Sequence, residues 1–483
     1  MGIVVTVFTV FAVFTAVVAA RRIQGIRQFD GRAPAGIYGT RIFQRKGAGF
    51  VEMKRCFLVS RLFLPPSAGR DAGGHSRRRA ERPAAALLLA AALLLTGCGA
   101  APSPESGTGA ASTGSTTPSS VSSAASAPST PPTSTTTVYR DPQTGIAYDN
   151  NDLTGKTAER FELPLEGATG FAPVAMDATA APQGAGGTVA SLSPGDAFTI
   201  LEEKDGRWWR VTQDDAWTGW VDSTYCYLNI PDVVPSIVFD NTNAYSSVFV
   251  SSGKSIPGIT GEKLYDSRRW NERLGEEQYV VAANYIMVKK IYTAQQAALA
   301  DGYTLVINET FRPFDVQLDV AGKLKALYAE DAGVKAGIDK SPWGIGWFIA
   351  SKLSTHQIGC AMDVSLARVN RMEVRLSGGY RYAVVTDAAL CGMPTAMHEL
   401  SSAAVCLKQP VNSYSKTAWK SADPADSMTE DALRLQKYCT DTGLSPLASE
   451  WWHFNDLEAK EAIGSHYTTE VFYIDDCLSR VPE

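Results

Sequence analysis

The chain contains no pair of cysteines spaced as Cys-x-x-Cys, although it has eight cysteines in 483 residues. A zinc cage built from thiolates and a thioredoxin-type redox site are therefore not expected. Neither acidic nor basic residues are in large excess: the formal net charge is −5, and no long basic run follows residue 100. Nucleic acid is accordingly not expected as a partner. Hydrophobic residues make up 45% of the chain, and its length allows two or three domains with real cores.

A short apolar run precedes Cys98. Residues 84–95 read AAALLLAAALLL, four arginines stand before them, and Leu-Thr-Gly-Cys follows. A basic flank, a short apolar core and small residues are typical of a secretory signal, and the run is too short to span a membrane. The ending resembles the lipobox of bacterial lipoproteins. That resemblance implies export, lipidation of Cys98, cleavage just before it and anchoring on the outer face of the cytoplasmic membrane. The alternative is a short buried helix of a cytosolic protein.

The remaining N-terminal sequence divides into a leader, residues 1–98, and a linker, residues 99–140. Residues 2–20 are almost wholly apolar and could form a membrane helix, but Met53 offers a later start. We therefore interpret some or all of residues 1–52 as an over-extended reading frame, with a genuine span as the alternative. From residue 99 to 137 nearly every residue is Gly, Ala, Pro, Ser or Thr. Such a tract cannot bury enough apolar surface to order itself, so we expect a disordered tether.

After the tract of small and polar residues, residues 165–232 contain β-prone runs and predict a small all-β module. Short β-prone runs at 198–201, 208–211 and 219–221 are separated by turn sequences such as Ser-Pro-Gly-Asp and Asp-Gly. This spacing predicts a small barrel. The order Pro-Gly-Asp, Asp-Gly-Arg-Trp-Trp-Arg-Val and Gly-Trp-Val resembles bacterial SH3 domains, which often bind wall peptides. A packing module without a ligand of its own is an equally good interpretation.

Residues 236–480 mix helical and strand patterns and predict an α+β domain. A helical pattern covers residues 284–300, and residues 303–311 alternate as a strand that ends before Pro313. Apolar residues from 316 to 327 then mark one face of a further helix, for which Asp315 is the predicted N-cap.

Two short segments in this domain carry the residues from which a metal site can be built. In the first, His356 precedes Gly359 and the alternating run that contains Asp363. A strand with this alternation points Asp363 away from its apolar face, and Gly359 allows a tight turn that brings imidazole and carboxylate together. In the second segment, Glu450 and His453 stand three residues apart beside two tryptophans.

The residue types fit a hydrolytic zinc site. Two imidazoles and one carboxylate suit a catalytic zinc that keeps a position for water, and a second carboxylate can act as general base. Arg312, at the end of the 303–311 strand, can balance the oxyanion that forms during attack. Taken singly, each residue is more often structural. A lone histidine is usually a core residue with its hydrogen bonds made inside the protein, and the aromatic residues of a Glu-Trp-Trp-His run usually pack in the core.

Together the motifs Phe-Arg-Pro, Ser-x-His-x-x-Gly-x-Ala-x-Asp and Glu-x-Trp-His resemble the zinc D-alanyl-D-alanine dipeptidase and carboxypeptidase family, which includes the vancomycin-resistance dipeptidase. The resemblance covers about residues 240–480 and implies a small antiparallel sheet with helices around one zinc ion. It implies a substrate that is a peptidoglycan stem peptide or the D-Ala-D-Ala dipeptide. The residue roles it implies are zinc ligation by His356, Asp363 and His453, general base catalysis by Glu450, oxyanion stabilisation by Arg312, and substrate contact by Ser354 and Tyr265.

One stretch departs from the family pattern. His398 stands where relatives often carry a Phe-Asp-Glu-type run, and we favour a structural role over a substrate-side one. In an exported protein, a disulfide among Cys360, Cys391 and Cys406 would brace the site. Domain order favours carboxypeptidase over dipeptidase activity. The other functions considered are a zinc endopeptidase that cuts another wall peptide bond and a non-catalytic wall-binding lipoprotein.

Overall fold

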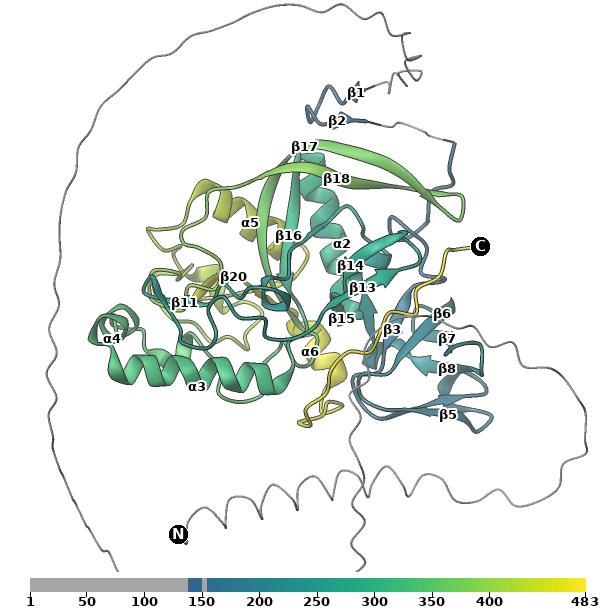
Figure 1. The fold of residues 1–483 in the computed structure, drawn as a ribbon, viewed down its shortest axis with the longest axis horizontal. Coiled ribbons are helices and arrows are strands. Elements are labelled where there is room, and N and C mark those ends of the chain that lie inside the picture. The colour runs from purple at the N-terminus through teal and green to yellow at the C-terminus, as the bar shows by residue number, and fades with distance from the viewer. Residues whose placement is uncertain (1–137, 150–153) are drawn as a thin grey trace, which may run out of the picture. The chain divides into compact units, whose positions relative to one another are not determined.

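The computed structural model describes residues 138–149 and 154–483. The predicted leader, Cys98 and almost all of the predicted tether lie outside these residues. The described residues belong to one of the two compact units of the chain, Val121–Glu483. Within them, no helix is long and apolar enough to cross a membrane. Helices and sheets are both present, which confirms the α+β class (Figure 1).

The first sheet carries the residues of the predicted metal site. Its eight strands are β1 (Tyr139–Arg140), β2 (Ala147–Tyr148), β10 (Val238–Phe239), β16 (Tyr303–Glu309), β17 (Ala361–Ser377), β18 (Tyr380–Leu390), β19 (Ser445–Leu447) and β20 (Glu450–Asn455). The long strand β17 pairs antiparallel with β16, β18 and β20 along different parts of its length. With β18 it forms the long hairpin drawn at the top of Figure 1. Strand β17 is therefore the element around which the other strands are arranged.

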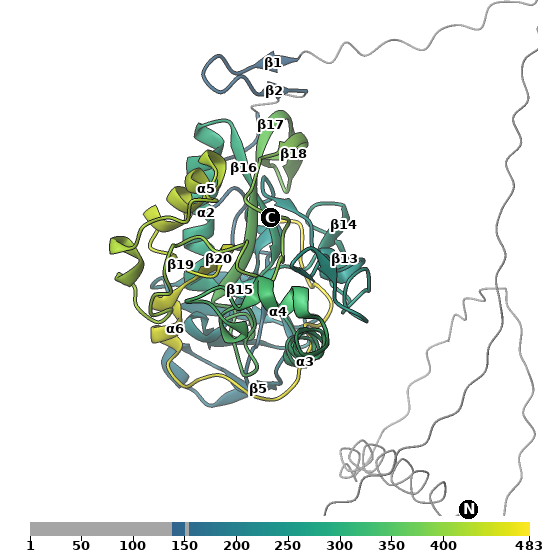
Figure 2. The same cartoon turned by 90° about the vertical axis from the view of Figure 1, so that its left-hand side faces the viewer.

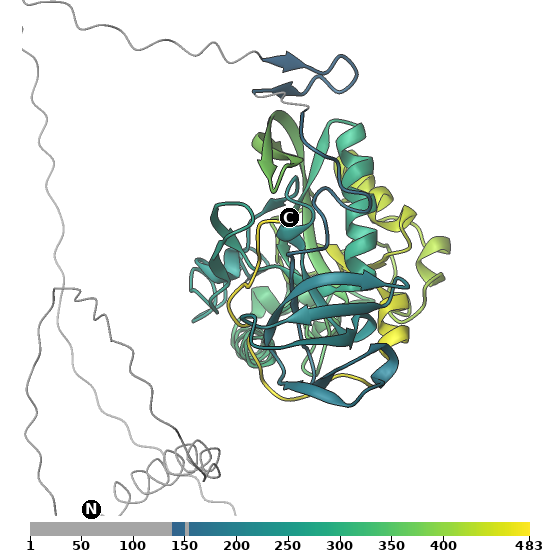
Figure 3. The same cartoon turned by 90° about the vertical axis from the view of Figure 1, so that its right-hand side faces the viewer.

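A second sheet of eight short strands precedes most of this domain in the sequence. Its strands are β3 (Thr169–Phe171), β4 (Met176–Thr179), β5 (Thr188–Leu192), β6 (Ala197–Lys204), β7 (Trp208–Thr212), β8 (Thr218–Asp222), β9 (Tyr227–Asn229) and β15 (Ala282–Asn284). All of its pairings are antiparallel. It faces the viewer in the lower half of Figure 3. The three strands predicted between residues 198 and 221 correspond to β6, β7 and β8.

The helices and two small hairpins complete the described fold. The helices are α2 (Tyr285–Ala300), α3 (Phe314–Glu330), α4 (Ala332–Ile338), α5 (Glu430–Asp441) and α6 (Leu457–Ile463). The hairpins are β11 (Val250–Ser251) with β12 (Lys254–Ser255), and β13 (Arg268–Asn271) with β14 (Glu276–Tyr279). Helices α2 and α5 lie side by side (Figure 2). The predicted helix over residues 284–300 is α2, and its N-cap is Asn284, whose side chain accepts from the amide of Ile286.

The predicted capping role of Asp315 is wrong. Helix α3 begins after Pro313, which lies at the N-cap and offers no side-chain cap, and Asp315 lies inside the first turn. Its carboxylate accepts hydrogen bonds from the amide of Val316 and from the hydroxyl of Tyr473. The restricted φ of Pro313 starts the helix without a capping side chain. The negative charge of Asp315 in the first turn interacts favourably with the helix dipole.

The second sheet and the α+β domain share one apolar core. Trp209 of β7 packs against Tyr285 of α2 with ring centroids 4.7 Å apart, and the hydroxyl of Tyr285 donates to Glu203 of β6. Strand β15, which follows the predicted module in sequence, completes the sheet by pairing with β9. Burial of these aromatic rings stabilises the junction.

The C-terminal segment after α6 runs across the second sheet, as the yellow trace in Figure 1 shows. The amide of Asp475 donates to the carbonyl of Gly195, and the amide of Arg480 donates to the carbonyl of Gly167. Phe472 packs on the ring of Phe311 with centroids 4.9 Å apart. Residues 472–480 therefore act as a strap that joins the two sheets, and we call them the C-terminal strap.

The predicted disulfide near the site is not present. All six cysteines among the described residues have free thiols. Cys360 packs in a small apolar cluster with Ile358 and α6, whereas Cys406 belongs to the main core. Cys360 therefore lies in a different apolar cluster from Cys406 and from Cys391, which packs against the same main core as Cys406.

Candidate metal centre

Strand register places three acidic or imidazole side chains in one row across the first sheet. Glu309 of β16 is opposite Asp363 of β17, and Asp363 is opposite His453 of β20. Residues directly opposite in antiparallel strands have side chains on the same face. Met362 and Val364, the neighbours of Asp363, point into the apolar core, as the alternation in the sequence predicted. Asp363 is consequently fixed toward the polar face by the packing of its neighbours.

His356 reaches this row from the turn before β17. Gly359 has a φ of +64°, and a Cβ there would lie 2.5 Å from the ring of Tyr227. Both the positive φ and the close approach require glycine, which is the predicted tight turn. The amide of Gly359 donates to the carbonyl of His356, so the turn closes directly behind the histidine.

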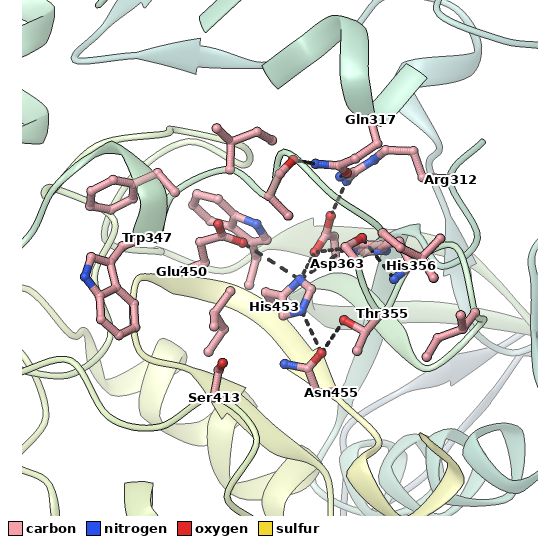
Figure 4. Close-up of a pocket in the computed structure, with 18 of the residues that line it drawn as sticks. Arg312, Gln317, Trp347, Thr355, His356, Asp363, Ser413, Glu450, His453 and Asn455 are labelled. Carbon is pink, nitrogen blue, oxygen red and sulfur yellow. Dashed lines mark hydrogen bonds and ion pairs between the residues drawn. The ribbon is translucent and has the colours of Figure 1, made fainter. Parts of the chain in front are cut away.

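The donor atoms of His356, Asp363 and His453 converge on one point (Figure 4). His356 Nε2 lies 3.2 Å from His453 Nδ1 and 3.4 Å from Asp363 Oδ1, and His453 Nδ1 lies 3.0 Å from the same oxygen. Ligands bound tetrahedrally to zinc at 2.0–2.1 Å are separated by roughly 3.3 Å. The three separations therefore match three corners of a zinc coordination tetrahedron.

The far sides of the two imidazole rings determine which nitrogens carry hydrogen. His356 Nδ1 lies 2.6 Å from the carbonyl oxygen of Thr310, which can only accept, so Nδ1 is the donor. His453 Nε2 lies 3.1 Å from Oδ1 of Asn455, which also accepts. In the neutral rings, His356 Nε2 and His453 Nδ1 then both present lone pairs to the convergence point, beside a carboxylate oxygen. Three lone pairs at this distance repel one another unless a cation lies between them.

The second oxygen of Asp363 is bound by groups outside this trio. Arg312 Nη2 donates to Asp363 Oδ2 at 2.9 Å, and His398 Nε2 lies 3.1 Å from the same oxygen. Burial would raise the pKa of Asp363, but the positive charge of His356 in its protonated form and the hydrogen bond from His398 hold this pKa well below its usual value. Asp363 is therefore an ionised carboxylate with one oxygen directed at the two histidines.

Arg312 is held by three partners. Its Nε donates to Glu309 at 2.6 Å, its Nη1 donates to Gln317 at 2.7 Å, and its Nη2 contacts both Glu309 and Asp363. A guanidinium has five N–H groups, so these contacts leave one N–H of Nη1 uncommitted. Glu309, Asp363 and His398 also form a second cluster of metal-type donors. The guanidinium of Arg312 bridges the two carboxylates of that cluster, so their negative charge is already balanced by the arginine and not by a metal ion.

Glu450 is a carboxylate beside the centre that has no close hydrogen-bonding partner within residues 138–149 and 154–483. Its Oε2 lies 3.8 Å from His453 Nδ1, and the side chain lines the same cavity. Burial raises the pKa of Glu450 to about 8, and the charge of His453 counteracts this only in part. A buried carboxyl group with a raised pKa beside a metal-type donor set is what a general acid or base requires.

The cavity that contains these groups has a volume of about 420 Å³. Its floor carries the buried polar groups described above, and its walls include Trp347, Leu400 and Trp452. Aromatic and aliphatic side chains around a few convergent polar groups are typical of a site for a small organic ligand. Trp452 would also exclude water from the floor, which strengthens electrostatic effects there.

The two residues predicted to contact substrate lie in different places. Ser354 lines the cavity, and its hydroxyl donates to Oε1 of Gln357 at 2.8 Å. Tyr265 does not line it. Its hydroxyl donates to Oε1 of Glu309, and the ring lies behind that carboxylate. His398 is fully buried, lines the cavity and contacts Asp363. The structural role that we favoured for it over a substrate-side role stays a prediction.

Sequence reasoning missed the residues that position the donors. Each of three residues contacts a predicted site residue, and none of them was predicted from the sequence as part of the site: Glu309, Gln317 and Asn455. Glu309 had a detectable signal, because a carboxylate inside an apolar strand needs a partner and Arg312 follows three residues later. Asn455 had the signal of standing two residues after His453 on the same face of a strand.

Comparisons with known proteins add no family assignment. No protein-family model matches the chain, and no curated protein matches it.

Proposed function

We propose that this chain is a zinc-dependent peptidase that hydrolyses D-alanyl-D-alanine-type bonds in peptidoglycan stem peptides or their precursors, as a D,D-carboxypeptidase or dipeptidase. The observation that carries the zinc proposal is the convergence of His356, Asp363 and His453 at separations of 3.0–3.4 Å. The preference for D-alanine rests on the motif resemblance described above.

The donor set fits zinc better than magnesium or calcium. Two imidazole nitrogens and one carboxylate oxygen are the ligands of many catalytic zinc sites, whereas the harder cations prefer oxygen alone. When bound, zinc would supply a more acidic water and polarisation of the substrate carbonyl. Thr310 and Asn455 hold the two rings in the tautomers that such binding needs.

Glu450 is the proposed general base. Its carboxylate would take a proton from the attacking water as the oxygen of that water bonds to the peptide carbonyl carbon. It would then pass the proton to the departing amine nitrogen when the C–N bond breaks. A cation held by the three donors would also lower the raised pKa of Glu450 toward neutrality, because positive charge favours the ionised form.

Arg312 has two proposed roles. Its contacts with Glu309 and Asp363 hold the metal-binding carboxylate in one orientation. The remaining N–H of Nη1 can donate to the oxyanion that forms on the substrate carbonyl, since Arg312 lines the cavity. Substitution of Arg312 should therefore disturb both metal binding and turnover.

The rest of the chain supports a place at the cell wall. We interpret residues 165–232 as an SH3-like module, joined through a tether at 99–140 to a lipid anchor on Cys98 at the outer face of the cytoplasmic membrane. Because the module packs on α2 and under the C-terminal strap, we favour a packing role for it over an independent wall ligand. The anchor would keep the enzyme near its substrate.

Metal analysis combined with product identification tests this proposal. The wild-type protein is expected to bind one zinc ion and to release D-alanine from a pentapeptide stem. Glu450→Gln should keep the metal and lose several orders of magnitude in turnover, whereas His356→Ala should lose the metal itself. Release of a different fragment would indicate an endopeptidase. Full metal binding by the wild type without cleavage of any wall peptide would contradict the proposed activity.

A further inference from the structure

A lysine lies at the mouth of the cavity, away from the buried floor. Helix α6 follows directly after β20, the strand that carries His453. Leu457 and Lys460 of this helix are three residues apart, so they share one helix face, and both line the cavity. The neighbouring lining residues Tyr414 and Tyr467 are 70% and 44% exposed, which identifies this end as the mouth.

Lys460 has no acidic partner among residues 138–149 and 154–483. The nearby acids are engaged elsewhere: Asp456, the N-cap of α6, and Glu458 both bind Lys290, and Glu461 pairs with Lys416. Instead, the ammonium of Lys460 lies 3.9 Å from the centre of the Tyr414 ring. Lys460 is half-buried, and the incomplete hydration that follows lowers the pKa of its ammonium. A partly buried cation without a counter-ion gains free energy when an anion binds to it.

The other cation that lines the cavity is not available for an anion of this kind. Arg312 is buried and already pairs with Glu309 and Asp363. The cavity therefore has two chemically distinct ends. Its floor combines the metal-type donors with Glu450, and its mouth presents one uncommitted ammonium beside an aromatic ring. The volume of about 420 Å³ lies in the range that holds ligands larger than a dipeptide.

We propose that Lys460 and Tyr414 form a subsite for a substrate carboxylate that is remote from the scissile bond. The preferred substrate is then an acidic peptide longer than a dipeptide, with its cleaved bond at the floor and its acidic group at the mouth. This inference rests on the proposed peptidase function, and it favours a carboxypeptidase over a dipeptidase. The ring of Tyr414 orients the ammonium, and the carboxylate replaces the counter-ion that the protein does not provide.

Two synthetic pentapeptides test the subsite. One is L-Ala-γ-D-Glu-L-Lys-D-Ala-D-Ala, and the other is identical except that the α-carboxylate of D-Glu is converted to the amide. Dissociation constants are measured by calorimetry with the zinc-loaded, full-length Glu450→Gln protein, and kcat/KM is measured with the enzyme that retains Glu450. We expect the acid to bind about five- to tenfold more tightly than the amide at low salt, with the difference shrinking as salt is added.

Variants of Lys460 assign the difference to this residue. Lys460→Met should remove the preference for the acid and leave binding of the amide unchanged, and Lys460→Arg should retain the preference. Lys420→Met is the matched control, because Lys420 is an exposed lysine that does not line the cavity, and it should behave like the unmodified protein.

The outcomes separate the two proposals. Equal binding of the acid and the amide, or an equal loss of both in Lys460→Met, would overturn the subsite alone. Binding with the expected preference but without cleavage would support the subsite and overturn the peptidase function. If neither pentapeptide binds, the subsite and the carboxypeptidase activity both fail, and the peptidase proposal then stands only if the free D-Ala-D-Ala dipeptide is cleaved.

Discussion

Oδ2 of Asp363 lies 3.1 Å from Nε2 of His398, and this is the carboxylate oxygen that His356 and His453 do not contact. The two oxygens of Asp363 are thus divided between the convergence point and a supporting shell. His398 stacks on Phe249 with ring centroids 4.2 Å apart, so its orientation is fixed by packing. His398 therefore positions a predicted metal ligand.

Replacement of His398 should weaken zinc binding without abolishing it. His398→Phe keeps a ring against Phe249 and removes the hydrogen bond to Asp363. Loss of such a supporting contact typically lowers metal affinity 10- to 100-fold, so about this decrease is expected in a chelator competition titration. His398→Gln, which retains an N–H donor, should recover part of the affinity. Unchanged affinity in His398→Phe would show that Arg312 alone orients Asp363.

Zinc should stabilise the folded protein through the three donors. At free zinc equal to 100 times the dissociation constant, the free energy of unfolding should rise by about 2.7 kcal/mol. Thermal unfolding with and without zinc measures this gain. His356→Ala retains all six described cysteines and should show no gain, which separates the predicted site from zinc bound by thiols. An equal gain in both proteins would place the metal elsewhere.

Glu162 predicts a pH dependence of stability that is independent of the metal centre. Burial raises its pKa to about 7, although hydrogen bonds from Ser236 and Gln296 act in the opposite direction. Between pH 4.5 and 7 the unfolded chain ionises Glu162 while the folded protein keeps it protonated. The folded state then binds more protons, so stability falls as pH rises through this window.

The comparison with Glu162→Gln isolates this effect. Between pH 4.5 and 7, we expect the free energy of unfolding of the wild type to fall by about 2 kcal/mol relative to that of the variant. This figure allows for solvent screening, because the side chain of Glu162 keeps some contact with solvent. Denaturant unfolding at several pH values measures the difference. Parallel stability curves for the two proteins would contradict the raised pKa.

Because the C-terminal strap lies directly against Gly195, adding a single methyl group there should strongly reduce the free energy of unfolding. A Cβ at this residue would lie 2.2 Å from the carbonyl oxygen of Tyr473, and its φ is +99°. Gly195→Ala should cost about 3 kcal/mol of unfolding free energy, from backbone strain and displacement of the strap together. Gly187→Ala is the control: Gly187 has a φ of +83° and open space around it, so only strain of about 1 kcal/mol is expected. Limited proteolysis should cut after residue 470 sooner in Gly195→Ala than in the control.

Much of the secondary structure could be predicted because local patterns determine it. The alternation after Gly359 correctly indicated a strand with Asp363 on its polar side, and helix α2 matched its apolar spacing. The same patterns gave no information about how far β17 extends, since its length follows from pairing with β18. The role of β15 in the second sheet was also hidden, because a three-residue strand has too few positions to show a period.

The metal-type donors could be predicted from motifs, but their surroundings could not. His356, Asp363 and His453 stand in short recognisable segments, whereas Glu309 joins them only through the register of β16 against β17. Lys460 and Tyr414 are 46 positions apart in the numbering and meet only in the folded chain. Contacts of this kind depend on tertiary packing, which a single sequence does not display.

The C-terminal strap has a consequence for the order in which the protein matures. Strands β3 and β6 are synthesised about 300 and about 270 residues, respectively, before the segment that covers Phe171 and Ala197. Until residues 472–480 have been synthesised, that apolar seam stays open to solvent and to chaperones. Closure of this apolar surface therefore has to wait for residues 472–480, and a chain truncated before the strap should leave Phe171 and Ala197 accessible to solvent.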